Sequence, residues 1–123
     1  MTNLISDNKV FPKYNDLTDK DIKHIESQYE DHWGHISENY VLSEDFIKLH
    51  QNEVDWECIS NSQELSEEFI IEFQDKVDWY WISNSQELSI KFISLFYNKI
   101  WFNCVVYNDK ISDEVKEFCK IFI

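Results

Sequence analysis

The sequence repeats itself with a period of 23 residues, and this repetition limits the folds open to the chain. The segment LSEDFI at positions 42–47 returns as LSEEFI at 65–70, and ISNSQE at 59–64 returns unchanged at 82–87. A period of this length indicates stacked supersecondary units, each too small to bury its own apolar face. We therefore expect an array of repeats, a type of protein that binds other molecules more often than it catalyses reactions.

The first half of each copy has the pattern of a short amphipathic helix. In the second copy Leu65, Phe69 and Phe73 lie about one helical turn apart, which places them on one face. A hydroxyl residue precedes the polar first turn in every copy, where its side chain is well suited to cap a helix N-terminus. These residues are Thr18, Ser43, Ser66, Ser89 and Ser112.

The second half of each copy also begins like a helix. Asp78 is the expected N-cap, with Val77 and Ile82 forming a hydrophobic staple around it, and Asp55 has the same place one copy earlier. The segment 100–107 has β-branched and aromatic residues that would suit a strand, but its register matches two helical copies. With one glycine and one proline in the chain, tight hairpin turns are not expected either.

These patterns predict an all-α fold of short two-helix repeats, stacked side by side as a small, solenoid-like single domain. The expected parts are an N-terminal lead-in (1–16), a divergent repeat (17–41), three repeats (42–64, 65–87 and 88–110) and a C-terminal capping helix (111–123). The third repeat carries apolar Trp101, Val106 and Tyr107 where earlier copies are polar. We expect the last helix to cover them with Val115, Phe118, Cys119 and Phe122.

The charge of the chain excludes several kinds of partner. The net charge is −13, and residues 16–87 alone contain 19 acidic residues against four lysines, without any arginine in the chain. Direct binding to nucleic acid or to an anionic membrane is therefore not expected. The chain also shows no signal peptide and no apolar run long enough to span a bilayer, which predicts a cytoplasmic protein, in the host cytoplasm if a phage encodes it.

No catalytic or metal-binding motif is found. His24, His32 and His35, with Glu30 and Asp31, have the residue types of a metal site but not the spacing of a known one, so a solvated helix face is the preferred interpretation. Neither a nucleophile motif nor a glycine-rich loop is present. We expect no enzyme activity, no metal and no cofactor.

The cysteines follow the repeat. Cys58 and Cys104 share the position of Trp81, and Cys119 aligns with Phe73. This alignment favours a role as core residues, with a disulfide as the alternative.

The aromatic residues divide into two groups. Four stand at one repeat position and are expected to be buried along the stack: Trp33, Trp56, Trp79 and Phe102. Tyr80, Trp81 and Trp101 instead replace unlike residues of sister copies, so some of them should reach the surface. Exposed aromatic side chains are typical of protein-binding surfaces.

The acidic residues are either a solvated face or a binding surface. Helices pack 8–10 Å apart, so each repeat would advance the stack by about 10 Å and three repeats would span roughly 30 Å. Acids that are one period apart in sequence would then be aligned along this length. B-DNA carries roughly 18 charges over that length, close to the charge of these repeats. The predicted partner-binding residues are therefore Glu44, Asp45, Glu53, Glu57, Glu64, Glu67, Glu68, Glu72, Asp75 and Glu87, together with Tyr80, Trp81 and Trp101.

Written as LSxxFIxxFxxxVDWxxISxxQ, the unit resembles a short helical repeat of uncharacterised proteins from phages, giant viruses and some bacteria. The match is close in residues 42–87, weaker in 88–123 and loose in 17–41. The resemblance implies a helical-repeat fold and no particular activity. In size and charge the chain is also similar to small acidic phage proteins that bind host nucleic-acid machinery, such as anti-restriction and anti-CRISPR proteins.

The sequence thus predicts a non-catalytic, acidic protein-binding inhibitor that occupies the nucleic-acid-binding channel of a partner. The expected partner is a basic, nucleic-acid-binding protein such as a nuclease or a guide complex, and the expected biological role is anti-defence (anti-CRISPR-like) action of a phage or mobile element. The alternative is a general helical-repeat scaffold for protein interactions, in which the acidity is incidental. The sequence specifies neither the partner nor the oligomeric state.

Overall fold

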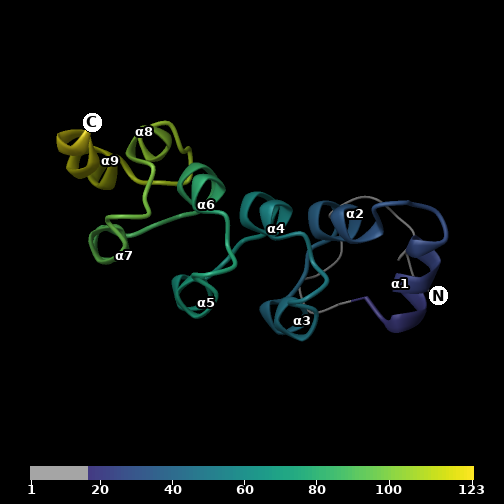
Figure 1. Ribbon diagram of the computed structural model, residues 1–123. Coiled ribbons are helices and arrows are strands. Elements are labelled where there is room, and N and C mark those ends of the chain that lie inside the picture. Colours follow the sequence, from purple (N-terminus) through teal and green to yellow (C-terminus); the bar gives the residue numbers. More distant parts are fainter. Residues whose placement is uncertain (1–16) are drawn as a thin grey trace. The chain divides into compact units, whose positions relative to one another are not determined.

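The computed structural model describes residues 17–123 (Figure 1), and the predicted lead-in, 1–16, lies outside the described residues. Within residues 17–123 the chain forms nine α-helices and one 3₁₀ helix, with no strand, which confirms the all-α prediction. The residues gather into two compact units, divided between Gln63 and Glu64. A single solenoid-like domain made of both units stays a prediction.

Over residues 17–63 the first unit contains four helices: α1 (Asp19–Glu26), α2 (His32–Asn39), α3 (Glu44–Leu49) and α4 (Trp56–Ser62). Helices α2 and α4, the second helices of consecutive repeats, lie side by side, and α1 packs against α2 (Figure 1). The core consists of apolar residues spaced along these helices, and four of its fully buried members are Ile25, Ile36, Ile47 and Ile59.

The second unit contains α5 (Glu67–Glu72), α6 (Trp79–Ser85), α7 (Ile90–Leu95), α8 (Phe102–Val105), α9 (Asp113–Cys119) and the 3₁₀ helix η1 (Lys120–Phe122). Here α6 lies beside α8, which repeats the pairing of α2 with α4, and α9 packs against α8. Fully buried core residues include Ile70, Ile82, Ile93 and Val105.

The predicted N-caps are confirmed. The Ser43 hydroxyl accepts a hydrogen bond from the Phe46 N–H at 3.0 Å, and Thr18, Ser66, Ser89 and Ser112 cap α1, α5, α7 and α9 in the same way. Asp55 and Asp78 cap α4 and α6. These side chains satisfy N–H groups that have no partner within their own helix.

The segment 100–107 is helical, as its register predicts, but the helix is short. Trp101 stands at the N-cap of α8, where the earlier copies have aspartate, and its side chain accepts no capping hydrogen bond. Helix α8 has four residues, whereas α4 and α6 have seven each. The lost cap and the β-branched Val105 and Val106 both disfavour a longer helix at this position.

Buried polar side chains join neighbouring repeats of the first unit. The amide of Gln63, which is 3 % exposed, donates to the carbonyls of Ser37 (2.9 Å) and Tyr40 (2.6 Å) and accepts from the N–H of Leu42 (3.0 Å). The Ser37 hydroxyl, also buried, accepts from the N–H of Asp55 at 3.0 Å. We call this arrangement of Ser37 and Gln63 the first polar clamp.

The second unit has an equivalent arrangement. Asn108 donates to the carbonyls of Ser83 (3.0 Å) and Gln86 (2.8 Å), and the Ser83 hydroxyl accepts from the N–H of Trp101 at 3.0 Å. Gln86 accepts from the N–H of Leu65 at 3.1 Å. The repeated ISNSQE segment therefore supplies hydrogen bonds to backbone groups of neighbouring repeats, a role that the repeat pattern alone does not predict.

The prediction that aromatic residues at one repeat position are buried is wrong in degree. Trp33, Trp56, Trp79 and Phe102 are half-buried. The indole N–H of Trp56 donates to the carbonyl of Gln51, and that of Trp79 donates to Gln74, each at 3.0 Å. One ring edge thus meets a polar backbone group while the opposite side packs on the core, as Trp79 does on Phe92 at a centroid distance of 6.1 Å.

The C-terminal helix packs on α8, in agreement with the capping role, but of the three residues it was predicted to cover only Val106 is half-buried. Val115 and Cys119 are buried, and Phe122 stacks on Phe102 at a centroid distance of 4.8 Å. Trp101 and Tyr107, which we expected α9 to cover, remain exposed.

Deletion of residues 111–123 should uncover several hundred Å² of apolar surface around Phe102 and cause dimerisation or aggregation. Size-exclusion chromatography with light scattering measures this effect, and Ile121→Ala is the matched control because Ile121 is exposed. A monomeric truncation that melts at the temperature of the full chain would contradict the capping role.

Candidate protein-binding surfaces

The acidic side chains of both units lie at the surface. Between residues 17 and 87 none of the 18 acidic residues is buried and 13 are exposed. Among the ten predicted partner-binding acids, eight are exposed and two, Glu44 and Glu67, are half-buried. These charges therefore face solvent, where they are available to a partner.

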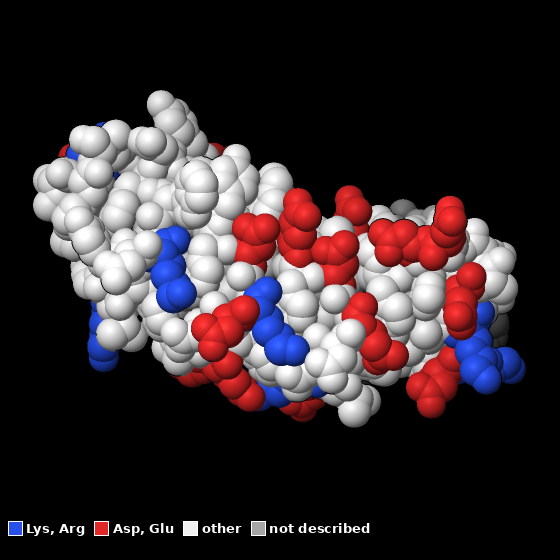
Figure 2. Space-filling model, viewed as in Figure 1, with Lys and Arg blue, Asp and Glu red and all other residues white. Residues whose placement is uncertain are grey.

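The first unit carries most of the charge. Residues 17–63 contain 11 acidic residues and three lysines, a net charge of −8. Figure 2 shows acidic side chains gathered over α2 and α4. Glu53 is hydrogen-bonded to the ring of His50 (2.7 Å), whereas Asp45 and Glu57 are exposed on α3 and α4.

In the second unit the charge is uneven. Residues 64–87 contain seven acidic residues and one lysine, net −6, whereas residues 88–123 contain four acidic residues and five lysines, net +1. The surface over α8 and α9 has few charged side chains on the face shown in Figure 2. The second unit thus has an acidic half and a nearly neutral, aromatic half.

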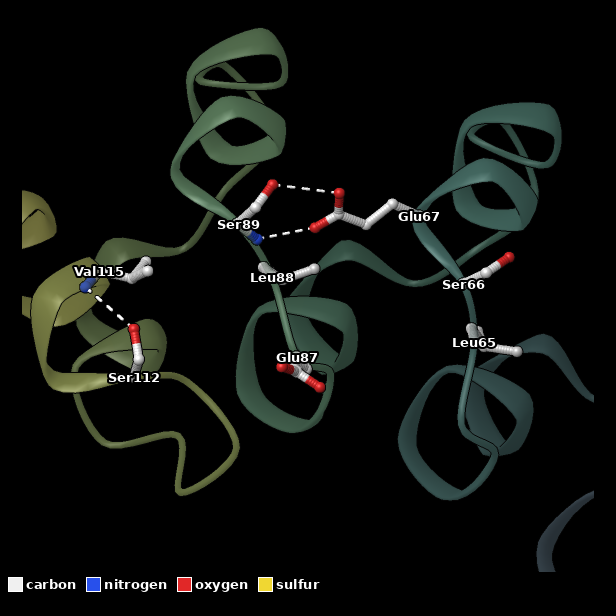
Figure 3. Close-up of a pocket in the computed structure, with 8 residues that line it drawn as sticks. All are labelled: Leu65, Ser66, Glu67, Glu87, Leu88, Ser89, Ser112 and Val115. Atoms are coloured by element: carbon white, nitrogen blue, oxygen red, sulfur yellow. Dashed lines mark hydrogen bonds between the residues drawn. The ribbon is translucent and has the colours of Figure 1, made fainter.

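Glu67 has a structural contact that the sequence did not predict. Its carboxylate accepts from the N–H of Ser89 at 2.7 Å and from the Ser89 hydroxyl at 3.1 Å (Figure 3). The pair borders a cavity of about 420 Å³ that is also lined by Leu65, Ser66, Glu87, Leu88, Ser112 and Val115. Glu67 therefore links the start of α5 to the start of α7, and it is a poor choice for a substitution meant to test charge alone.

The predicted alignment of acids pairs residues that are one repeat apart. Three pairs join a residue of the first unit to one of the second: Glu44 with Glu67, Asp45 with Glu68, and Asp55 with Asp78. The fourth pair, Glu64 with Glu87, lies within the second unit. Their alignment along one surface stays a prediction of the repeat.

Tyr80, Trp81 and Trp101 form one cluster, which we call the aromatic cluster. The Tyr80 ring meets Trp81 at a centroid distance of 5.0 Å and Trp101 at 5.3 Å, both nearly perpendicular to it. Tyr80 is 40 % and Trp101 is 54 % exposed, while Trp81 is half-buried. The sequence predicted that some of these residues reach the surface, and the structure brings all three together between α6 and α8.

The histidines predicted to lie on a solvated helix face differ in exposure: His24 is exposed, whereas His32 and His35 are half-buried. His32 borders a cavity of about 360 Å³ with Trp33, His50 and Glu53, whereas His35 stacks on Tyr29 at a centroid distance of 3.8 Å. His50, the C-cap residue of α3, meets the Trp33 ring of α2 at a centroid distance of 5.1 Å, a proximity that local spacing does not reveal. Within residues 17–123 no three His, Cys, Asp or Glu side chains are placed to hold a metal ion.

All three cysteines are free thiols. Cys119 is buried, as expected of a core residue, but Cys58 and Cys104 are half-buried, so for these two the prediction of a core position is wrong in degree. Burial, with the charges of Asp55 and Glu38 beside it, raises the pKa of the Cys58 thiol from its ordinary 9.0 to about 11. Because the thiolate is the reactive form, Cys58 is a weak nucleophile at neutral pH.

Burial also raises the pKa of Cys104, and a hydrogen bond with the Tyr80 side chain acts in the opposite direction. This contact places the Cys104 thiol directly beside the aromatic cluster.

No protein-family description, curated protein or solved structure is significantly similar to this chain. None of the helices in residues 17–123 has the length and apolar character needed to cross a membrane.

Proposed function

We propose that the chain is a non-catalytic protein-binding module that binds the basic, nucleic-acid-binding surface of a partner. The observation that carries the proposal is the complete surface placement of the acids in residues 17–87, none of which is buried. Repulsion among so many like charges costs stability, and a basic partner offsets that cost on binding.

The narrower form of the proposal is an inhibitor that occupies the nucleic-acid channel of a nuclease or guide complex, in the manner of phage anti-defence proteins. The density of acids per repeat, compared with that of a DNA backbone, supports it. The general interaction scaffold is the second candidate, and the exposed aromatic cluster favours it because aromatic side chains bind protein surfaces without requiring charge.

Competition with nucleic acid separates the two candidates. The immobilised protein would capture proteins from a lysate of the producing cell or its host, and the bound fraction would be eluted with a 20-bp DNA duplex or with poly-glutamate at the same charge concentration. We expect the duplex to elute a nucleic-acid-binding protein at several-fold lower charge concentration than poly-glutamate, because its channel fits the duplex. Equal elution by both polymers, or a captured protein that holds DNA and this chain simultaneously, would favour the scaffold.

A further inference from the structure

We propose that the aromatic cluster binds an arginine side chain of the basic partner. This proposal takes the basic charge of the partner from the proposed function. It adds the side-chain contact through which the chain recognises that partner. The guanidinium would lie against the exposed ring of Trp101 and the neighbouring ring of Tyr80.

Trp101 weakens the start of its own helix. At the equivalent position of earlier copies, Asp55 and Asp78 cap α4 and α6, whereas the Trp101 side chain makes no cap and α8 is three residues shorter than α6. Burial of the Trp101 side chain does not compensate for the lost cap, because 54 % of Trp101 remains exposed. A large aromatic residue that neither caps nor enters the core is better explained by contact with another molecule.

The rings of the aromatic cluster have the chemistry to bind a cation. Tyr80 is perpendicular to both tryptophans, so the cluster presents ring faces in more than one direction. Aromatic faces attract cations within about 6 Å, and tryptophan does so best. The same unit already contains one such contact, since the ammonium nitrogen of Lys99 lies 5.9 Å from the Trp79 ring centroid.

A negative charge complementary to that of arginine lies beside the aromatic cluster. The Asp78 carboxylate accepts a hydrogen bond from the N–H of Tyr80 at 3.1 Å and therefore lies next to the cluster. It belongs to the segment 64–87, which carries a net charge of −6. A cation is attracted to this half of the unit, and a planar guanidinium stacks on aromatic rings better than an ammonium does. These observations point to arginine as the occupant.

Calorimetric titration with a hexa-arginine peptide at low salt tests the proposal. The decisive variant is Trp101→Asp, which restores the residue that caps the equivalent helices and adds a negative charge. Attraction by charge alone predicts equal or tighter binding of this variant. Stacking on the ring predicts binding about three- to thirtyfold weaker than wild type, with Trp101→Tyr close to wild type.

Tyr107→Ala is the matched control, because Tyr107 is 82 % exposed and lies outside the cluster. It should bind hexa-arginine within about twofold of wild type, since it removes no ring from the cluster. Saturating peptide should also slow the reaction of Cys104 with N-ethylmaleimide, since Cys104 contacts Tyr80.

The outcomes separate this inference from the proposed function. Unchanged or tighter binding by Trp101→Asp, or unprotected Cys104, would overturn the arginine contact while leaving a charge-driven interaction in place. A different outcome is weaker binding by Trp101→Asp together with full binding by variants whose exposed acids are replaced by amides. It would support the arginine contact and overturn the electrostatic proposal. If wild-type protein does not bind hexa-arginine at low salt, both are wrong.

Discussion

Replacing Gln63 with alanine should lower the free energy of unfolding by at least about 3 kcal/mol. The substitution leaves the carbonyls of Ser37 and Tyr40 and the N–H of Leu42 without the amide that satisfies them. Each buried polar group that loses its partner costs about 1–3 kcal/mol, against a total stability of about 5–15 kcal/mol for a small protein. Urea unfolding followed by circular dichroism measures the loss.

Gln51→Ala is the matched control within the same unit. Gln51 is half-buried, and its amide donates one hydrogen bond, to the carbonyl of Lys48 at 3.1 Å. Its replacement should cost no more than about 1 kcal/mol. If the two variants had equal stability, the first polar clamp would not hold the repeats together.

The helix starts could be predicted from the sequence because the signals for them are local. A serine or aspartate before a polar first turn satisfies N–H groups only two or three residues away, so Ser43, Ser66 and Asp55 could be recognised by spacing alone. The same reasoning explains the short α8, whose N-cap position holds Trp101.

The first polar clamp and the equivalent arrangement around Asn108 could not be predicted, because the groups that they join are distant in sequence. Gln63 bonds to backbone groups 21–26 residues away, and an unchanged repeat of ISNSQE does not reveal which carbonyls need a donor. In the second unit the donor of these hydrogen bonds is Asn108, which lies one residue before the position that the period gives for the equivalent of Gln63. Simple alignment of the copies therefore does not identify Asn108 as the donor.

The aromatic residues show a further limit of the repeat. The period correctly grouped Trp56 with Trp79. It did not predict that each indole N–H donates a hydrogen bond to a carbonyl at the edge of the core, which leaves the ring half-buried. Likewise the sequence predicted that some of Tyr80, Trp81 and Trp101 reach the surface, but the contact of these rings depends on the packing of α6 beside α8.

Removing four exposed acids should weaken binding to a basic partner by orders of magnitude. The variant combines Asp45→Asn, Glu68→Gln, Asp75→Asn and Glu87→Gln, all at exposed positions, and keeps Glu67 because its carboxylate holds Ser89. Two of the changes lie in helix first turns, where each should cost about 0.3–1 kcal/mol of stability. Affinity for hexa-arginine and for the captured partner would be measured by calorimetry.

The chain offers a control with the same change of charge. Asp109→Asn, Asp113→Asn, Glu114→Gln and Glu117→Gln also remove four negative charges, but from the segment 88–123, whose net charge is +1. We expect this control to bind within a few-fold of wild type. Equal loss in both variants would show that total charge matters and that the acidic surface of residues 17–87 does not.

If surface charge drives binding, the dissociation constant for the partner must depend on the salt concentration. Titration of the captured partner with wild-type protein would be repeated at several concentrations between 50 and 200 mM sodium chloride. Charge-driven binding predicts that affinity falls at least about tenfold over this range, mainly through slower association, and that the four-acid variant loses most of this dependence. An affinity that does not change with salt would contradict the account and leave contact through the aromatic cluster as the basis of binding.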